Sequence, residues 1–148
     1  MTSLYFFALM AMNVMAPNRD HEPLARALAT VAETEEPLFR NDESRIKTLS
    51  LLLSVAFRES SFRNDAVGDH GRSYCAFQVH QSSGGSPALL DDPGACTRTA
   101  FAMLRESIRV DPSAPVAFYA RGPRYRSEEA RRLSRDRMWL ARRIAGER

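Results

Sequence analysis

The sequence predicts a single, mainly helical domain with a small β-hairpin or ordered loop inserted between its helices. The chain has 148 residues, a length typical of one compact domain. Apolar residues recur at helical spacing over most of the chain, and one glycine-punctuated stretch, residues 64–93, interrupts them. Hydrophobic residues make up 44% and charged residues 26% of the chain, an ordinary balance for a globular domain with its own core.

Residues 1–17 predict an N-terminal apolar helix. The run from Leu4 to Met15 is too short to cross a membrane, so no transmembrane segment is expected. It resembles the core of a signal peptide but lacks the positively charged start, so it does not predict one convincingly. We interpret it as an amphipathic helix that packs on the domain. Residues 22–33 predict the next helix, with Asp20 as its N-cap.

The third helix is predicted to begin at Asp42, a favourable N-cap, and to end close to Glu59. Past its first turns, apolar residues occupy nearly every face of this helix. They are Ile46, Leu49, Leu51, Leu52, Leu53, Val55, Ala56 and Phe57. A helix that is apolar all round is typical of a protein interior. We therefore expect it to run through the middle of the domain.

Residues 64–93 show no helical periodicity. Their centre, from Ser73 to His80, alternates and carries aromatic residues, which predicts a small β-hairpin or an ordered loop. Long ordered segments of this kind in compact domains are commonly functional.

Three more helices are expected after this segment. The first spans Cys96–Val110, the second is a short helix from Asp111 to about Gly122, and the last is a basic helix at 127–146. In the last helix Arg137 falls on the apolar stripe and Trp139 lies nearly opposite it, and the pattern explains neither placement.

The C-terminal segment is strongly basic. It carries nine arginines from Arg124 to Arg148 against four acidic residues, while the whole chain has a net charge of +3. Such a segment suits an anionic surface, whether cell-wall polymer, nucleic acid or lipid headgroups, or forms a solvated helix face. No interleaved aromatic residues favour base stacking, so no nucleic-acid partner is expected. A monomer is expected.

Cys75 and Cys96 are the two cysteines of the chain. From the residues alone they form either a disulfide in an oxidising compartment or two reduced core thiols. The three histidines have no zinc-ligand spacing, so no metal or other cofactor is expected.

Glu59 stands at the end of the most apolar helix. Burial and the negative end of the helix dipole both favour the neutral acid, as a general acid requires. Arg58 and Arg63 lie nearby in the sequence and favour the carboxylate instead. On these features a structural ion pair and a catalytic acid are equally supported.

Three sequence blocks between Leu51 and Pro123 resemble the lytic transglycosylases and goose-type lysozymes. The blocks are Glu59-Ser60-x-Phe62 followed by Phe77-Gln78-Val79, then Asp92-Pro93 before a helix, then Val116 to Pro123, which is similar to the Ala-Tyr-Asn-Ala-Gly-Pro segment of that family. The chain departs from the last segment at two positions, where Ala120 replaces an asparagine and Arg121 replaces an alanine.

The resemblance implies a lysozyme-like α+β fold and a catalytic region at 42–123. Glu59 would be the single catalytic acid/base. The implied substrate-binding residues are Gln78, Tyr119, Ser60, Phe77 and Asp69. Asp69 is also the best-placed second carboxylate, should one be needed. A Cys75–Cys96 disulfide becomes plausible because both residues would lie in the same half of the domain.

The function implied by the resemblance is cleavage of the β-1,4 bond between N-acetylmuramic acid and N-acetylglucosamine in peptidoglycan. We expect a lytic transglycosylase that leaves 1,6-anhydro ends, with a goose-type hydrolase and a non-catalytic peptidoglycan-binding module as alternatives. Its expected place of action is the cell wall, in the periplasm, outside the cell or in association with a phage.

Overall fold

The computed structural model describes residues 3–147 and shows a mainly helical domain with a small sheet at one end. The main elements are α1 (Ser3–Met15), α2 (Glu22–Thr34), α3 (Ser44–Ser60), β1 (Val67–Gly68), β2 (Ser73–Tyr74), β3 (Val79–His80), α4 (Pro93–Val110), α5 (Ala117–Arg121) and α6 (Glu128–Ile144). Short 3-10 turns lie at Asp69–Gly71, Gln81–Ser83, Pro87–Asp91 and Gly122–Arg124. The predicted fold class, mainly α with a small β element, is confirmed.

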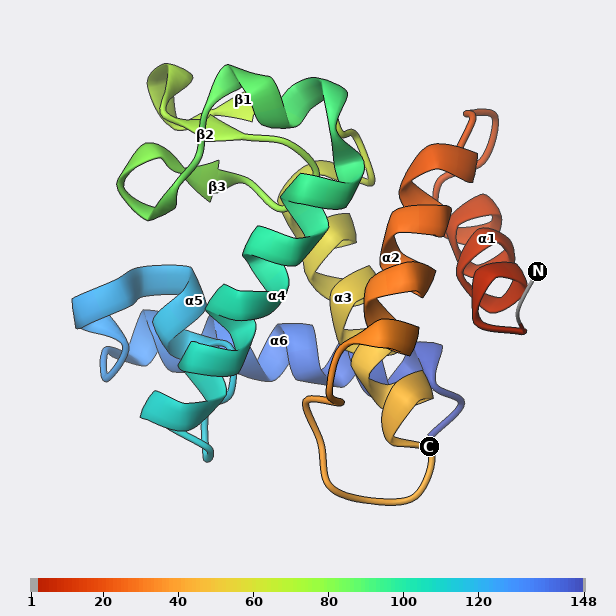
Figure 1. Ribbon diagram of the computed structural model, residues 1–148. Helices are drawn as coiled ribbons and strands as arrows, with labels where there is room; N and C mark the ends of the chain where they lie inside the picture. Colours follow the sequence, from red (N-terminus) through yellow and green to blue (C-terminus); the bar gives the residue numbers. More distant parts are fainter. Residues whose placement is uncertain (1–2, 148) are drawn as a thin grey trace.

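α3 runs through the middle of the domain, as its sequence predicts (Figure 1). Every residue from Thr48 to Ala56 is buried. The other helices surround it: α2 packs on α1, α3 and α4, and α6 crosses α3 on the opposite side. Removing the apolar sides of α3 from water is the main favourable term for this arrangement.

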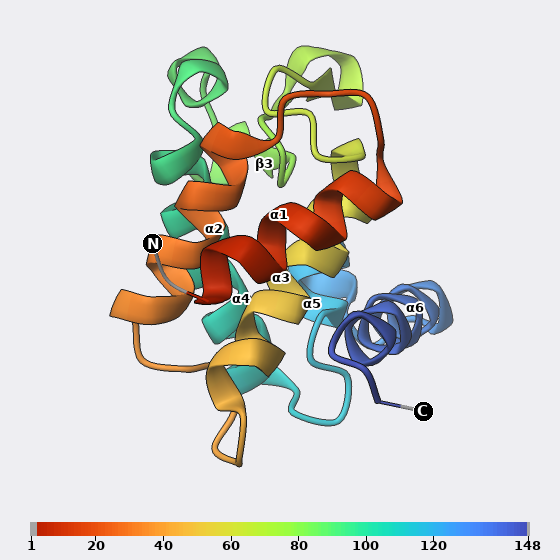
Figure 2. The same ribbon diagram turned by 90° about the vertical axis from the view of Figure 1, so that its right-hand side faces the viewer.

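α1 lies across α3 at the outside of the domain (Figure 2). Its inner side chains, among them Leu4, Ala8 and Met12, are buried in the core. The outer face is not polar, however, because Met10 and Val14 are exposed. The predicted packing is confirmed, and the predicted amphipathic pattern is wrong. Within residues 3–147 no helix has the length and apolar character needed to cross a membrane.

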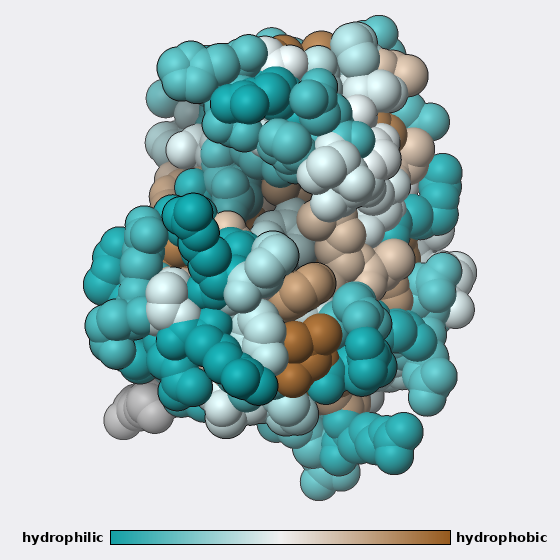
Figure 3. Space-filling view, turned by 90° about the vertical axis from the view of Figure 1, so that its left-hand side faces the viewer, coloured by the Kyte–Doolittle hydropathy of each residue, from teal (hydrophilic) through white to brown (hydrophobic). Residues whose placement is uncertain are grey.

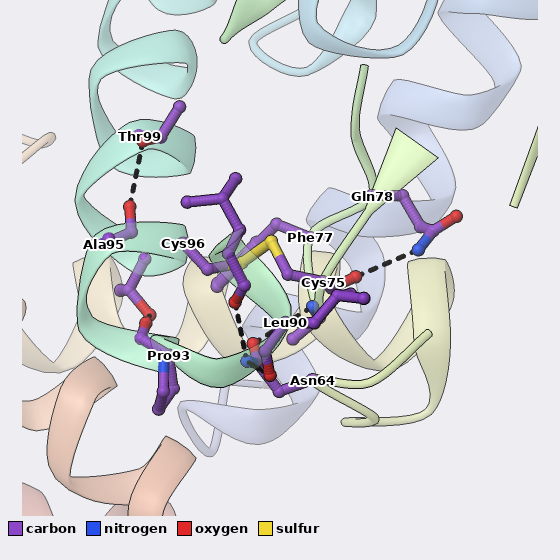
Figure 4. The surroundings of a disulfide bond; sticks show 12 residues. Asn64, Cys75, Phe77, Gln78, Leu90, Pro93, Ala95, Cys96 and Thr99 are labelled. Atoms are coloured by element: carbon purple, nitrogen blue, oxygen red, sulfur yellow. Dashed lines mark hydrogen bonds between the residues drawn. A yellow bond between two sulfur atoms is a disulfide. The ribbon is translucent and has the colours of Figure 1, made fainter. Parts of the chain in front are cut away.

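The segment after α3 forms a three-stranded antiparallel sheet in the order β1-β2-β3. Gly68 pairs with Ser73, and Ser73 pairs in turn with His80. The Asn64 side chain fixes the segment to the chain that precedes α4, because its amide donates to the carbonyl oxygens of Leu89 and Leu90 at 3.0 and 2.9 Å (Figure 4). The hairpin prediction is confirmed, with one additional strand.

Only some of the capping residues predicted from the sequence cap a helix in the structure. Ser127 caps α6 through a bond from the Ala130 N–H, as predicted, and Asp92 caps α4 through the Ala95 N–H. Asp42 does not cap α3, because the cap position is Glu43 in a left-handed conformation without a side-chain bond.

A helix at Asp111 was also expected and is absent. Residues 111–116 form turns, in which the Asp111 carboxylate accepts bonds from the backbone and hydroxyl of Ser113, and α5 begins only at Ala117. A side chain that bonds to nearby backbone groups in this way competes with helix formation.

Cys75 and Cys96 form a disulfide that joins the chain after β2 to the first turn of α4 (Figure 4). Both residues are fully buried, and their Cα atoms lie 6.3 Å apart. Of the two arrangements left open by the sequence, the structure shows the bonded one.

We predict that the double variant Cys75→Ala/Cys96→Ala loses about 3 kcal/mol of unfolding free energy, because the bridge closes a loop of 21 positions in the unfolded chain. Urea denaturation measures this loss. A reducing agent should lower the stability of the wild type similarly and leave the variant unchanged. A loss below about 1 kcal/mol would contradict a stabilising role for the bridge.

Candidate active site

A cleft lies between the sheet, α4 and α5. Its volume is about 960 Å³. Figure 3 shows this side of the molecule, with a hollow between the part that carries the sheet and the part that carries α5. The lining residues are Glu59, Asp69, Ser73, Gln78, His80, Ser82, Ser83, Ala102, Met103, Glu106, Phe118, Tyr119, Ala120, Arg121, Gly122 and Pro123. Four of the predicted site residues, Glu59, Gln78, Tyr119 and Asp69, therefore meet at one cleft.

Glu59 occupies the last turn of α3, where the buried helix reaches the cleft. Its side chain is 25% exposed. Burial raises the pKa of the Glu59 carboxyl above its ordinary value of 4.5, while the positive charges of Arg137 and Arg121 lower it less strongly. The net effect favours the protonated acid, so Glu59 can donate a proton into the cleft at a higher pH than an exposed glutamate can.

Arg137 is the neighbour of Glu59 that the sequence did not predict. Its Nη2 lies 3.8 Å from Glu59 Oε1, and its Nη1 donates to Asp136 at 2.9 Å. The Arg137 side chain is 13% exposed. Its backbone carbonyl accepts a bond from the Ser54 hydroxyl of α3 at 2.6 Å. The only sequence signal for this residue was an arginine on an otherwise apolar stripe of α6.

Ser60 connects the end of α3 to the cleft wall. Its hydroxyl lies 2.7 Å from the carbonyl oxygen of Ala76, to which it donates, and it accepts a bond from the Arg63 N–H at 3.1 Å. The residue therefore both caps the helix end and holds the segment that carries Gln78. It is a positioning residue, and it is not among the residues that line the cleft.

Gln78 lines the cleft and braces its own loop. Its Nε2 donates to the carbonyl oxygens of Ala66 and Cys75 at 3.2 and 3.0 Å. Its Oε1 approaches Gly68 so closely that a Cβ there would lie 2.2 Å from it. Gly68 is thus needed for this side-chain position. No residue among 3–147 donates to Oε1, which leaves one acceptor for a ligand.

Tyr119 joins the two walls of the cleft. Its hydroxyl donates to the carbonyl oxygen of Phe77 at 2.7 Å, and its backbone N–H donates to the Ser107 hydroxyl of α4. Burial and the nearby Glu59 charge raise the pKa of the Tyr119 phenol well above its ordinary value, so the hydroxyl remains protonated. The Tyr119 hydroxyl therefore acts as a hydrogen-bond donor that holds the segment around Phe77 against α5.

The Phe77 side chain does not line the cleft. It is fully buried in the core, and only its carbonyl group takes part in the site, through the bond from Tyr119. Phe77 was expected to bind substrate, and the structure places it instead beneath the wall that Gln78 presents.

Asp69 lies on the rim of the cleft with His80, which the sequence did not single out. Asp69 Oδ2 is 3.3 Å from His80 Nε2, and Oδ1 is 3.6 Å from Arg72 Nη2. The Asp69 side chain is 48% exposed. This half-exposed carboxylate, paired with Arg72 and His80, therefore lies in a different environment from Glu59.

The two positions that depart from the family resemblance also line the cleft. Ala120 offers no polar side chain, and Arg121 points to Glu129, to which its Nη2 donates at 2.8 Å. Within residues 3–147, no three histidine, cysteine or acidic side chains lie close enough together to hold a metal ion.

Comparison with protein-family models, with curated proteins and with solved structures finds no match to this chain.

We predict that Glu59→Gln makes the protein more stable than the wild type at neutral pH. Well below the ordinary pKa of 4.5, Glu59 is neutral in both folded and unfolded wild type. As the pH rises, the unfolded chain ionises first, because the folded-state pKa is raised, and the wild type loses stability until the folded carboxyl also ionises. The variant has no such loss, because the amide that replaces the carboxyl does not titrate.

Thermal unfolding of both proteins from pH 3 to 8 measures this difference. The two melting temperatures should converge at acidic pH and separate above the ordinary pKa of glutamate. Glu106→Gln serves as the control, because this glutamate is exposed and the hydrogen bond from Arg109 lowers its pKa. Its melting temperature should therefore not rise above that of the wild type as the pH increases. A wild type that gains stability over Glu59→Gln with rising pH would contradict the assignment.

Proposed function

We propose that this protein cleaves the β-1,4 bond between N-acetylmuramic acid and N-acetylglucosamine in peptidoglycan, with Glu59 as the acid and base. The observation that carries the proposal is one carboxyl, 25% exposed and with a pKa raised by desolvation, among the residues that line the cleft. Two of the three sequence blocks that resemble the lytic transglycosylases contribute residues to this cleft, with Glu59 and Gln78 from the first block and Tyr119 from the last. The substrate class comes from that resemblance.

In the first step, protonated Glu59 donates its proton to the glycosidic oxygen. The bond from this oxygen to C1 of the muramic acid then breaks, the bonding electron pair leaves with the oxygen, and N-acetylglucosamine departs with a free 4-hydroxyl. Positive charge develops at C1, and Glu59 becomes a carboxylate. Arg137, 3.8 Å away, is placed to stabilise that carboxylate without holding it in a short hydrogen bond.

In the second step, the Glu59 carboxylate accepts a proton from the C6 hydroxyl of the same muramic acid, and the oxygen forms a bond to C1. The product is a 1,6-anhydro sugar, Glu59 is protonated again, and no water is consumed. This route needs one carboxyl group, and Glu59 is the carboxyl of the cleft whose pKa burial raises. Asp69, the other carboxyl considered from the sequence, is 48% exposed and therefore less shielded from solvent than Glu59.

A hydrolase of the goose type is the alternative reaction at the same site. It would use Glu59 as the acid and deliver water to C1. A non-catalytic binding module is the alternative in another class, and Ala120 with the Arg121–Glu129 pair favours it, because the cleft lacks the asparagine side chain of the family at this position.

Digestion of purified peptidoglycan sacculi tests the proposal. Wild type should release muropeptides with 1,6-anhydro ends, detected by mass, and Glu59→Gln should be slower by about 10²–10⁴-fold, the usual contribution of a general acid. Glu22→Gln, the same chemical change at an exposed position of α2 outside the cleft, serves as the folding control. Reducing ends would identify the hydrolase, and equal release by wild type and Glu59→Gln would overturn the role of Glu59.

The pH profile of the same reaction tests Arg137. Because the Arg137 charge lowers the pKa of Glu59, Arg137→Met should raise this pKa further and move the alkaline limb of activity to higher pH. Arg137→Lys keeps a cation and should move the limb less. A purely structural arginine would reduce activity without shifting the limb, and that result would contradict the electrostatic role.

A further inference from the structure

The outward face of α6 presents arginines and one tryptophan. After the first turn, its exposed residues are Arg131, Arg132, Arg135, Trp139, Arg142 and Arg143. The apolar side chains of the helix face inward, with Ala130 and Ala141 buried. Trp139 is 56% exposed, an uncommon placement for a large apolar side chain.

Most of this positive charge is not neutralised by the protein itself. Arg135 lies 3.2 Å from Glu128. The other four exposed arginines of the helix form no ion pair with any residue of 3–147. Unpaired cations gathered on one helix repel one another, so their arrangement suits an anionic ligand.

A groove runs beside this face of α6, separate from the cleft that holds Glu59. Its volume is about 470 Å³. The turn at 112–115 forms one side, and Arg131, Arg135, Met138, Trp139 and Arg142 form the other. At 1.5 Å per residue, the arginines from 131 to 142 extend over about 16 Å of helix. This is the shape of a site for a chain that lies along the helix.

We propose that the groove binds a linear polyol-phosphate polymer, an anionic polymer class of cell walls. Arg131, Arg135 and Arg142 would contact successive phosphates, since the guanidinium fork matches phosphate geometry. The Trp139 ring would contact the polyol units between them. The choice of a wall polymer rests on the proposed function, whereas binding of a linear polyanion does not.

Two other anionic partners fit the groove less well. A membrane surface would need several apolar side chains beside the arginines, and Trp139 is the single apolar side chain among the exposed residues of α6. A single-stranded nucleic acid would need aromatic side chains on which successive bases stack. Trp139 is the one exposed aromatic side chain of α6, and the Arg143 guanidinium already lies over one face of its ring, 5.6 Å from the centroid.

Titration of Glu59→Gln protein with purified poly(glycerol phosphate) tests the proposal. Trp139 is the only tryptophan of the chain, so its emission reports on this groove alone. We expect a saturable change in emission, and an affinity that falls roughly tenfold or more between 50 and 200 mM salt, as release of counterions from about three phosphates requires.

A pair of matched double variants gives the decisive comparison. Arg131→Gln/Arg142→Gln should weaken binding about tenfold, whereas Arg40→Gln/Arg98→Gln, which removes the same charge from exposed positions elsewhere, should change it less than twofold. Equal losses in both variants, or no saturable change in emission, would overturn the proposal.

Two further ligands separate the sources of phosphate. Tighter binding of an oligodeoxythymidylate with the same number of phosphates would assign the groove to nucleic acid, and tighter binding of phosphatidylglycerol vesicles would assign it to a membrane; either result overturns the proposal. Because the titration uses Glu59→Gln protein, binding without any digestion of sacculi by wild type would refute the catalytic function and leave the polymer site standing.

Discussion

The burial of α3 is the constraint on which the rest of the structure depends. Leu49, Leu51, Leu52 and Leu53 point in different directions around the helix, and each is fully buried. Burial of one leucine side chain contributes roughly 1.5–3 kcal/mol. Neighbouring helices must therefore cover α3 on several sides, and α1, α2 and α6 do so. The uncovered end of α3 is the cleft, which is why the one carboxyl at that end is both desolvated and accessible.

Glu59 is held between two opposed influences. Desolvation favours the acid, and the Arg137 charge favours the carboxylate. A short, two-bonded pair with Arg137 would fix the ionised form, whereas a separation of 3.8 Å offsets only part of the desolvation. Asp136 takes the shorter bond to Arg137 and is also held by Arg58 at 3.1 Å. This shared partner keeps Arg137 from a closer contact with Glu59 and leaves the acid able to exchange its proton.

The sequence could predict the features that depend on local patterns. The buried character of α3, the Ser127 cap and the sheet segment each follow from a few consecutive residues. The contact between Glu59 and Arg137 joins positions far apart in the chain, so no local pattern could predict it. The sequence also could not show that Gln78 both lines the cleft and braces its loop. The bracing depends on hydrogen bonds from its amide to the carbonyl oxygens of Ala66 and Cys75. Phe77 was misplaced for a related reason: a motif names a residue but not which of its atoms faces the cleft.

α6 carries arginine on its inner face, at Arg137, and on its exposed face. The arginines of the two faces have different roles. The Arg137 side chain is 13% exposed, and its charge acts on the Glu59 carboxyl from 3.8 Å away. The outward arginines are solvated, and for them the planar fork matters more than the pKa. α6 therefore places one positive charge, Arg137, beside the Glu59 carboxyl and a second set of arginines on the surface. Because both belong to one helix, their relative positions are fixed by its geometry. Loss of helical register in α6 would disturb both sites together, whereas exchange of a single outward arginine would leave the cleft intact.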